Sequence, residues 1–200
     1  MEDESDAAVI AASIGEPTRF GAIFDRHATV LHRYLVRRLG PDEAESMVGE
    51  VFRIAFEKRD RYDHARLLAR PWLYGIATNL VAKHRRSEAR RLHAMARLAA
   101  RRLPPVDLAE EVAGAADAAD RWQRVAATVT ALPVPELDAL ILHVWEGLAY
   151  DDVAEALGVP VGTVRSRLNR ARRRLRELTT AHGGQPADST EGRAPGRIGS

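Results

Sequence analysis

The chain has 200 residues, enough for one or two small domains, and it contains no cysteine. It therefore has no disulfide, no thiolate metal site and no cysteine nucleophile. The net charge at pH 7 is only +2, but the charges are segregated along the chain. Residues 83–102 carry eight lysines or arginines against one acid, whereas residues 1–17 and 104–120 each carry five acids and no lysine or arginine. Basic blocks of this kind favour nucleic-acid binding, although a solvated helix face has the same pattern.

The N-terminus is acidic and lacks the basic start and apolar run of a signal peptide. No apolar segment approaches the length that spans a bilayer. We therefore expect a cytoplasmic protein without membrane insertion.

The N-terminal half predicts a helical domain over residues 18–96. Residues 1–17 form an acidic segment whose first few residues are expected to be disordered. A helix is predicted from Thr18, with apolar residues at helical spacing. Asp42 and Glu45 then resemble a capping box that starts a second helix.

A third helix is predicted after residues 58–66, which have no clear period and indicate a loop. Pro71 suits its first turn, and the helical pattern runs to about Arg91. Four polar residues follow one another on it at intervals of four, three and four, so they share an exposed stripe: Asn79, Lys83, Arg86 and Arg90.

The composition then changes. Residues 97–120 contain Leu103-Pro104-Pro105 and an alanine-rich acidic run, which is typical of a linker. A second helical domain is predicted over 121–179, and residues 180–200 have the composition of a disordered tail. Because no segment alternates as strands do, the fold class is all-α: two small helical domains joined by a flexible linker.

The second domain contains the most informative segment, residues 149–177. It predicts a short amphipathic helix, a turn at Gly158 and a second helix that carries seven arginines before Glu177. Val164 and Leu168 lie on the inward face of this second helix, at helical spacing. Arginine and asparagine on its opposite face suit base edges and phosphates in a DNA major groove. The segment therefore predicts a DNA-binding helix-turn-helix.

Three segments together resemble the extracytoplasmic-function (ECF) sigma factors of bacterial RNA polymerase. These are Glu45–Phe52, which resembles the polymerase-binding part of sigma region two; Arg70–Arg86, which resembles its promoter-melting and minus-ten-reading part; and the stretch from Leu132 to Arg172, which resembles region four. The order and spacing of the three are far more specific than any one alone.

The resemblance implies an alternative sigma factor that directs promoter recognition and transcription initiation. Its partners would be the polymerase core, through the β′ clamp helices and the β flap, and promoter DNA. Many members are held by an anti-sigma factor, which would be a further partner. Polymerase binding would use Glu45, Glu50 and Arg53. The minus-ten element would be met by Tyr62, Asp63, His64, Asn79, Lys83, Arg86 and Arg90, with the loop holding an extruded base. The minus-thirty-five element would be read by Thr163, Arg165, Ser166, Asn169, Arg170 and Arg173.

The sequence departs from the family pattern at three positions. Ser46 and Gly49 stand where the polymerase-binding helix usually carries acid or amide side chains. Glycine within a helix costs about 1 kcal/mol relative to alanine. Ala149 stands where a helix-capping serine is common, and a missing cap costs ~1 kcal/mol.

Two other functions compete with this interpretation. An autonomous helix-turn-helix regulator would explain the second domain but not the stripe at Asn79 or the ordered match to region two. An enzyme is disfavoured, because the chain has no His-Glu-x-x-His spacing, no glycine-rich phosphate loop after a strand and no nucleophile elbow. No metal, cofactor or catalytic residue is predicted.

Overall fold

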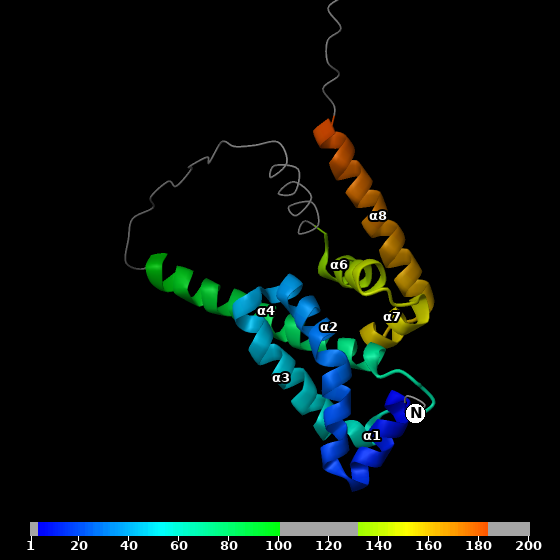
Figure 1. Ribbon diagram of the computed structural model, residues 1–200. Coiled ribbons are helices and arrows are strands. Elements are labelled where there is room, and N and C mark those ends of the chain that lie inside the picture. The colour runs from blue at the N-terminus through cyan, green and yellow to red at the C-terminus, as the bar shows by residue number, and fades with distance from the viewer. Residues whose placement is uncertain (1–3, 101–131, 184–200) are drawn as a thin grey trace, which may run out of the picture.

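The computed structural model describes residues 4–100 and 132–183, and these residues contain helices and no strand (Figure 1). The all-α prediction is confirmed. The first domain consists of α1 (Asp6–Gly15), a 3₁₀ turn at Pro17–Phe20, α2 (Gly21–Leu39), α3 (Pro41–Glu57), a 3₁₀ turn at Arg59–Arg61 and α4 (Arg70–Ala100). The second consists of α6 (Val134–Leu140), a π-helical turn at Ile141–Trp145, α7 (Tyr150–Leu157) and α8 (Val161–Gly183).

The core of the first domain lies where α2, α3 and α4 pack against one another. Leu31 and Leu35 of α2, with Leu73 of α4, are fully buried there. Tyr34 packs edge-on against Tyr74 with ring centroids 5.2 Å apart, and its hydroxyl lies 2.9 Å from Thr78 Oγ1. The aromatic pair therefore joins α2 to α4 with its polar ends satisfied.

Helix α1 is a feature that the sequence analysis did not predict, because residues 1–17 were interpreted only as an acidic segment. Ser5 caps it by accepting a hydrogen bond from the backbone N–H of Ala8 at 3.3 Å. Val9 and Ile10 are buried against the rest of the domain. The expectation of disorder for the first few residues concerns 1–3, which lie outside the described part.

Several predicted boundaries also differ. Helix α3 begins at Pro41, and Gly40 occupies the N-cap with φ +96° and no side-chain cap, so the capping box at Asp42 is wrong. Helix α4 continues past Arg91 to Ala100 and enters the predicted linker, since its sequence there is rich in the helix formers alanine and arginine. Helix α8 likewise extends beyond residue 179. The rest of the predicted linker and tail lies outside the described residues.

The helix-turn-helix forms as predicted. Val164 and Leu168 of α8 are fully buried, and α8 packs on both α6 and α7. Gly158 ends α7 in the left-handed conformation at φ +61°. Between α6 and α7, the π-helical turn at Ile141–Trp145 changes the angular spacing of side chains from that of α6. Val144 and Trp145, at the end of this turn, remain exposed.

The two domains contact each other through α4 and α7 (Figure 1). Gly75 of α4 lies so close to α7 that a Cβ there would be 2.9 Å from the carbonyl oxygen of Ala156. We call this docking of the second domain on the first the closed arrangement. The sequence predicted a linker between the domains and no contact of this kind.

Candidate nucleic-acid interface

The predicted DNA-reading face of α8 lies on the side opposite the buried Val164 and Leu168. Its members differ in exposure: Arg165, Asn169, Arg170 and Arg173 are exposed, whereas Thr163 and Ser166 are half-buried. Ser166 Oγ donates to the Thr163 carbonyl at 2.9 Å, so its hydroxyl has a partner within the helix. The exposed members are the ones that can reach a groove without rearrangement.

Arg170 is tied to α6 by an ion pair. Its Nε lies 3.1 Å from Oε1 of Glu136, and Arg174 Nε lies 3.5 Å from the other carboxylate oxygen. Glu136 is buried, so these arginines neutralise a carboxylate that would otherwise be costly. Arg170 therefore has a role within the domain that the sequence pattern did not reveal.

The stripe on α4 forms as predicted. Its four residues are exposed on one side of the helix: Asn79, Lys83, Arg86 and Arg90. Arg90 Nε donates to the Arg86 carbonyl at 3.2 Å, and within the described part of the chain neither Arg86 nor Arg90 forms an ion pair with an acid. The stripe presents its cations to solvent over several turns of one helix, a track on which a phosphate backbone could lie.

In the loop between α3 and α4, Tyr62 is buried and not available at the surface as the predicted minus-ten contact would need. This ring is 5% exposed, lies 5.0 Å from the Trp72 ring, and its hydroxyl donates to the Arg66 carbonyl at 2.6 Å. Burial raises the pKa of the Tyr62 phenol, with neighbouring carboxylates acting in the same direction. Asp63 and His64 remain exposed. Tyr62 therefore packs beneath the loop, whereas Asp63 and His64 lie at its surface.

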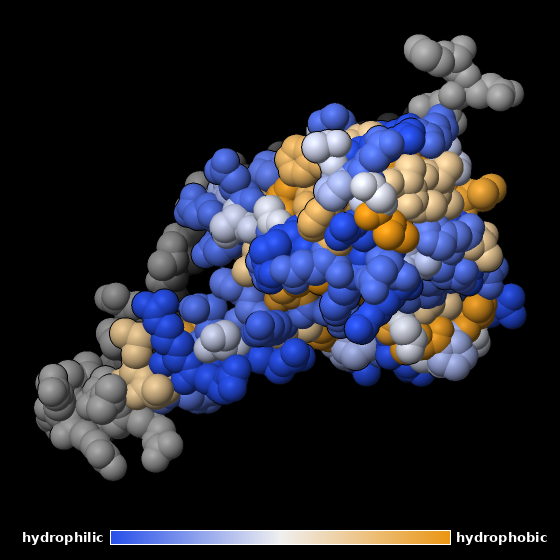
Figure 2. Space-filling model, turned by 90° about the horizontal axis from the view of Figure 1, so that it is seen from below, coloured by the Kyte–Doolittle hydropathy of each residue, from blue (hydrophilic) through white to orange (hydrophobic). Residues whose placement is uncertain are grey.

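Two features of this loop escaped the sequence analysis. Leu67 and Leu68 are exposed large apolar residues directly before α4. Asp6 of α1 is buried, and its Oδ2 accepts the backbone N–H of Ala69 at 2.9 Å. Figure 2 shows the end of the molecule that carries α1, where apolar patches lie among mainly hydrophilic side chains. The link from Asp6 to Ala69 joins residues 63 positions apart, so no local pattern could indicate it.

The predicted polymerase-binding residues lie together on α3. Glu45 is exposed, and Arg53 binds Glu50 at 2.6 Å and also pairs with Glu57. Hydrogen bonding from Arg53 lowers the pKa of Glu50, and Lys83 acts in the same direction. A Cβ on Gly49 would meet no atom within 4 Å, so this helix has an open surface beside Glu50.

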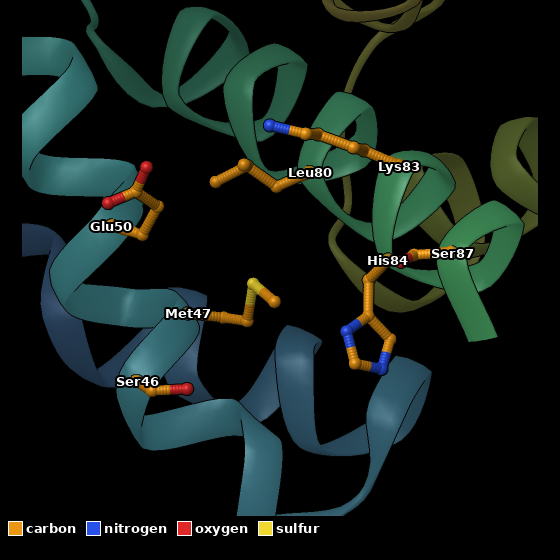
Figure 3. Close-up of a pocket in the computed structure, with 7 residues that line it drawn as sticks. All are labelled: Ser46, Met47, Glu50, Leu80, Lys83, His84 and Ser87. Atoms are coloured by element: carbon orange, nitrogen blue, oxygen red, sulfur yellow. The ribbon is translucent and has the colours of Figure 1, made fainter. Parts of the chain in front are cut away.

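A cavity of about 340 Å³ lies between α3 and α4. Figure 3 shows Met47 and Glu50 on α3 and Leu80 and Lys83 on α4, with Leu80 between the Glu50 and Lys83 side chains. Its lining residues are Ser46, Met47, Glu50, Leu80, Lys83, His84 and Ser87. The cavity therefore joins the predicted polymerase-binding face to the stripe on α4.

Neither a metal-binding cluster nor a membrane-spanning helix is found among the described residues. No group of three or more histidine, cysteine, aspartate or glutamate residues there could hold a metal ion. No helix among them is long and apolar enough to cross a membrane.

Comparison with known proteins gives two family matches: Sigma-70 region 2 over residues 23–91 and Sigma-70, region 4 over residues 122–175. The ECF RNA polymerase sigma factor SigL of Mycobacterium tuberculosis H37Rv is 30% identical over 171 residues, covering 85% of this chain and 94% of SigL. SigC of the same species, strain CDC 1551, is 30% identical over 172 residues, covering 86% and 89%.

Two solved structures share the fold. CnrH in complex with the cytosolic domain of CnrY has a TM-score of 0.61 and 25% identity, covering 88% of this chain and 97% of CnrH. RpoE of Bartonella quintana, in complex with the anti-sigma factor NepR, has a TM-score of 0.60 and 25% identity, covering 80% and 96%. With both sigma regions matched in order and relatives aligned over most of the chain, this protein belongs to the extracytoplasmic-function sigma factors of bacterial RNA polymerase.

Proposed function

We propose that this sigma factor reads its promoter with two separate surfaces, the stripe and loop of the first domain at minus ten and the exposed face of α8 at minus thirty-five. The observation that carries the proposal is the presence of one exposed basic face on each domain. A single duplex reader needs only one such face. A protein that binds a duplex element and also follows an unpaired strand needs both.

For the minus-thirty-five element, Arg165, Asn169 and Arg173 are the best base-reading candidates. All three are exposed on the side of α8 that faces away from its core. Arginine pairs bidentately with guanine, and asparagine with adenine, in the major groove. Arg170 reaches DNA only if its pair with Glu136 opens or turns. We assign it a phosphate contact rather than a base contact.

For the minus-ten element, Asp63 and His64 offer polar groups at the surface of the loop, while Tyr62 supports them from beneath. Asn79 and Lys83 lie on the helix that follows. An extruded base needs a pocket with hydrogen-bonding groups, and the strand beside it needs cations. The loop supplies the hydrogen-bonding groups and the stripe supplies the cations, from adjacent segments.

For polymerase binding, we propose that Glu45, Glu50 and Arg53 meet the β′ clamp helices. The Glu50→Lys variant should reduce capture of core polymerase while helicity and melting temperature stay near wild type, because Glu50 lies at the surface of α3. Glu177→Lys, at the far end of α8, is the matched charge control. Unchanged core affinity in Glu50→Lys would show that the dock lies elsewhere.

The experiment that tests the whole proposal is reconstitution with core polymerase on a promoter library, read by run-off transcripts and by permanganate reactivity of unpaired thymines. We expect an open bubble only when core is present. Asn79→Ala and His64→Ala should impair melting and leave binding to the minus-thirty-five duplex intact. If active core and this protein open no promoter of the library, the autonomous regulator becomes the better account.

An anti-sigma partner is also proposed. The structural relative RpoE was solved in complex with the anti-sigma factor NepR. We place the corresponding contact at the cavity between α3 and α4, where an inhibitor would cover Glu50 and Lys83 together.

A further inference from the structure

The loop between α3 and α4 contains an exposed segment that has no core of its own. Residues 63–68 are all exposed and lie between the buried Tyr62 and the buried Ala69. Even the apolar Leu67 and Leu68 are 67% and 63% exposed. A segment with so few buried contacts opens locally at little cost. Its position therefore depends on the hydrogen bonds within it and at its ends.

The first part of the segment is a closed turn. Asp63 Oδ1 accepts the N–H of Ala65 at 3.1 Å, and the Asp63 carbonyl accepts the N–H of Arg66 at 2.9 Å. The Tyr62 hydroxyl donates to the Arg66 carbonyl at 2.6 Å. Side-chain bonds of this kind fix the backbone of a turn locally. They do not fix where the turn lies relative to the stripe on α4.

Helix α1 holds the loop at both ends. At the start of the loop, Arg59 Nε donates to the Ser13 carbonyl, in the last turns of α1, at 3.3 Å. At its end, the N–H of Ala69 donates to Oδ2 of Asp6, in the first turn of α1, at 2.9 Å. Ser13 and Asp6 are 0% and 5% exposed, so water does not readily replace either contact. The two ends of the loop thus lie on the two ends of one helix.

Both anchors are themselves fixed by other contacts. Asp6 Oδ1 accepts Nη1 of Arg26 at 3.0 Å, and its Oδ2 lies 2.8 Å from His27 Nε2. Arg59 Nη1 donates to the Phe56 carbonyl at 2.6 Å, and its guanidinium lies 3.9 Å from the centre of the Phe56 ring. A buried carboxylate with several partners has a defined orientation. The bonds to the loop are therefore made by side chains that are already in place.

Capture of an extruded base depends on accurate placement of the loop. Asp63 and His64, the polar groups proposed to meet the base, lie in the exposed segment. Groups that bind a ligand must be held within about 0.5 Å of the productive geometry by neighbouring contacts. Only such placement brings donors and acceptors within hydrogen-bonding distance of a base edge. The anchors on α1 supply contacts of this kind.

We propose that α1 positions the minus-ten loop, with Asp6 fixing the end of the loop through the N–H of Ala69 and Ser13 fixing its start through Arg59. This inference rests on the proposed function, because it requires the loop to hold an extruded base. Asp6 is a positioning residue that acts through the loop backbone. It belongs to a segment that precedes the Sigma-70 region 2 match, which begins at residue 23.

The test measures how well the loop holds a base. Full-length chain with core polymerase would bind a single strand that carries the minus-ten element recovered from the promoter library. The strand would be intact or would carry one abasic nucleotide, at each position in turn. At the extruded base, wild type should favour the intact strand about tenfold, the order expected for one stacked base. Asp6→Ala should bring this ratio close to one and leave the affinity for core polymerase unchanged.

The ratio distinguishes positioning from stability. Partial unfolding would lower both affinities together and would leave their ratio as in wild type. Asp6→Asn keeps an oxygen that can accept the N–H of Ala69 but loses the charge that pairs with Arg26. It should therefore retain most of the ratio, although it also destabilises the domain.

Two further variants extend the test to other contacts of the loop. Arg59→Ala removes the anchor at the start of the loop and should lower the ratio in part; this residue is half-buried, so its loss should leave the domain folded. Glu155→Gln removes the ion pair that Arg66 makes with α7 at 3.2 Å. It is the matched control, because it releases a loop contact that does not involve α1, and it should keep the wild-type ratio.

Several results would overturn the proposal. If Asp6→Ala keeps the wild-type ratio, or if Asp6→Asn loses it as completely, the bond to Ala69 does not position the loop. If Asp6→Ala does not fold, an unchanged ratio in Arg59→Ala has the same consequence. A loss in Glu155→Gln as large as that in the α1 variants would mean that the second domain positions the loop. Wild type without a preference at any position would instead contradict the proposed role of the loop itself, so the two failures are distinguishable.

Discussion

Two arginines of α8 that look equivalent in the sequence have different surroundings in the structure. Arg173 is exposed and its Nε lies 3.6 Å from Glu177, itself exposed, a weak pair that DNA can displace. Arg170 is held by the buried carboxylate of Glu136. Replacement of Arg173 should therefore affect DNA binding alone, whereas replacement of Arg170 should also affect the stability of the domain.

We expect Arg173→Ala to weaken promoter binding by about 1–3 kcal/mol, the usual value of one base-reading arginine, with no loss of thermal stability. Arg170→Ala should instead lower the melting temperature as well, because Glu136 loses one of its partners. Anisotropy on cognate and scrambled duplexes, with thermal unfolding of each variant, measures both effects. Identical behaviour of the two variants would contradict the distinction.

At the scale of single elements, α1 shows how a segment outside the matched family region supports the predicted site. The Sigma-70 region 2 match begins at residue 23, whereas α1 spans Asp6–Gly15. The Asp6 carboxylate lies 2.8 Å from His27 Nε2, 3.0 Å from Arg26 Nη1 and 2.9 Å from the N–H of Ala69. One side chain therefore connects α1, α2 and the end of the loop before α4.

Acidification should reveal this connection. Burial raises the pKa of Asp6, but hydrogen bonds from Ala69 and Arg26 and the nearby His27 outweigh it, and the folded-state pKa lies below the ordinary 3.8. The unfolded chain then binds more protons in that range. The stabilisation is therefore present above pH 3.8 and is lost as the pH falls through the folded-state value.

We expect Asp6→Asn to lower the free energy of unfolding at pH 6 and to flatten its dependence on pH below about 4. Urea unfolding at several pH values measures both quantities. Asp25→Asn, at an exposed position of α2, is the control and should keep the wild-type slope. A wild-type slope in Asp6→Asn would show that its carboxylate contributes nothing to acid stability.

Helix α3 has a correctable weakness at Gly49. A Cβ there would meet no atom within 4 Å, and the residue lies in the interior of the helix. Alanine should therefore stabilise the domain by about 0.5–1 kcal/mol through helix propensity. For a domain of this size that corresponds to a rise in melting temperature of up to about 4–8 °C. A lower melting temperature would mean that a methyl group at Gly49 meets neighbouring atoms after all.

At the scale of the whole molecule, the closed arrangement depends on close backbone contact as well as on charge. Gly75 allows α4 to approach α7, and the oxygen of Ala156 leaves no room for a Cβ. Because that oxygen belongs to the backbone, it cannot turn away as a side chain could. A glycine-to-alanine substitution, which should stabilise α3 at Gly49, should therefore push α4 away from α7 at Gly75.

We expect Gly75→Ala to separate the domains while leaving the helical content unchanged, since alanine favours the helix itself. Spin labels on cysteines introduced at Thr29 and Val134, both exposed in a chain without native cysteine, would report longer distances, and small-angle scattering a larger radius of gyration. Gly49→Ala is the matched control and should remain closed. A closed Gly75→Ala protein would show that the two helices can shift to accept the methyl group.

Local patterns in the sequence were enough for much of the fold and part of the site. Helical spacing predicted the all-α class, the buried face of α8 at Val164 and Leu168 and the exposed stripe on α4, because each depends on residues within a few turns. The turn at Gly158 was predicted for the same reason, and this glycine has φ +61°. These features follow from chain geometry and the partition of apolar side chains.

Other features depended on contacts between distant residues. Burial of Tyr62 requires the ring of Trp72, and the order of the loop requires Asp6. The pair of Arg37 with Glu146 joins residues 109 positions apart. Because each such contact needs the whole backbone in place before its partners meet, only the tertiary structure decided that the loop is anchored from α1 and that the second domain closes on the first.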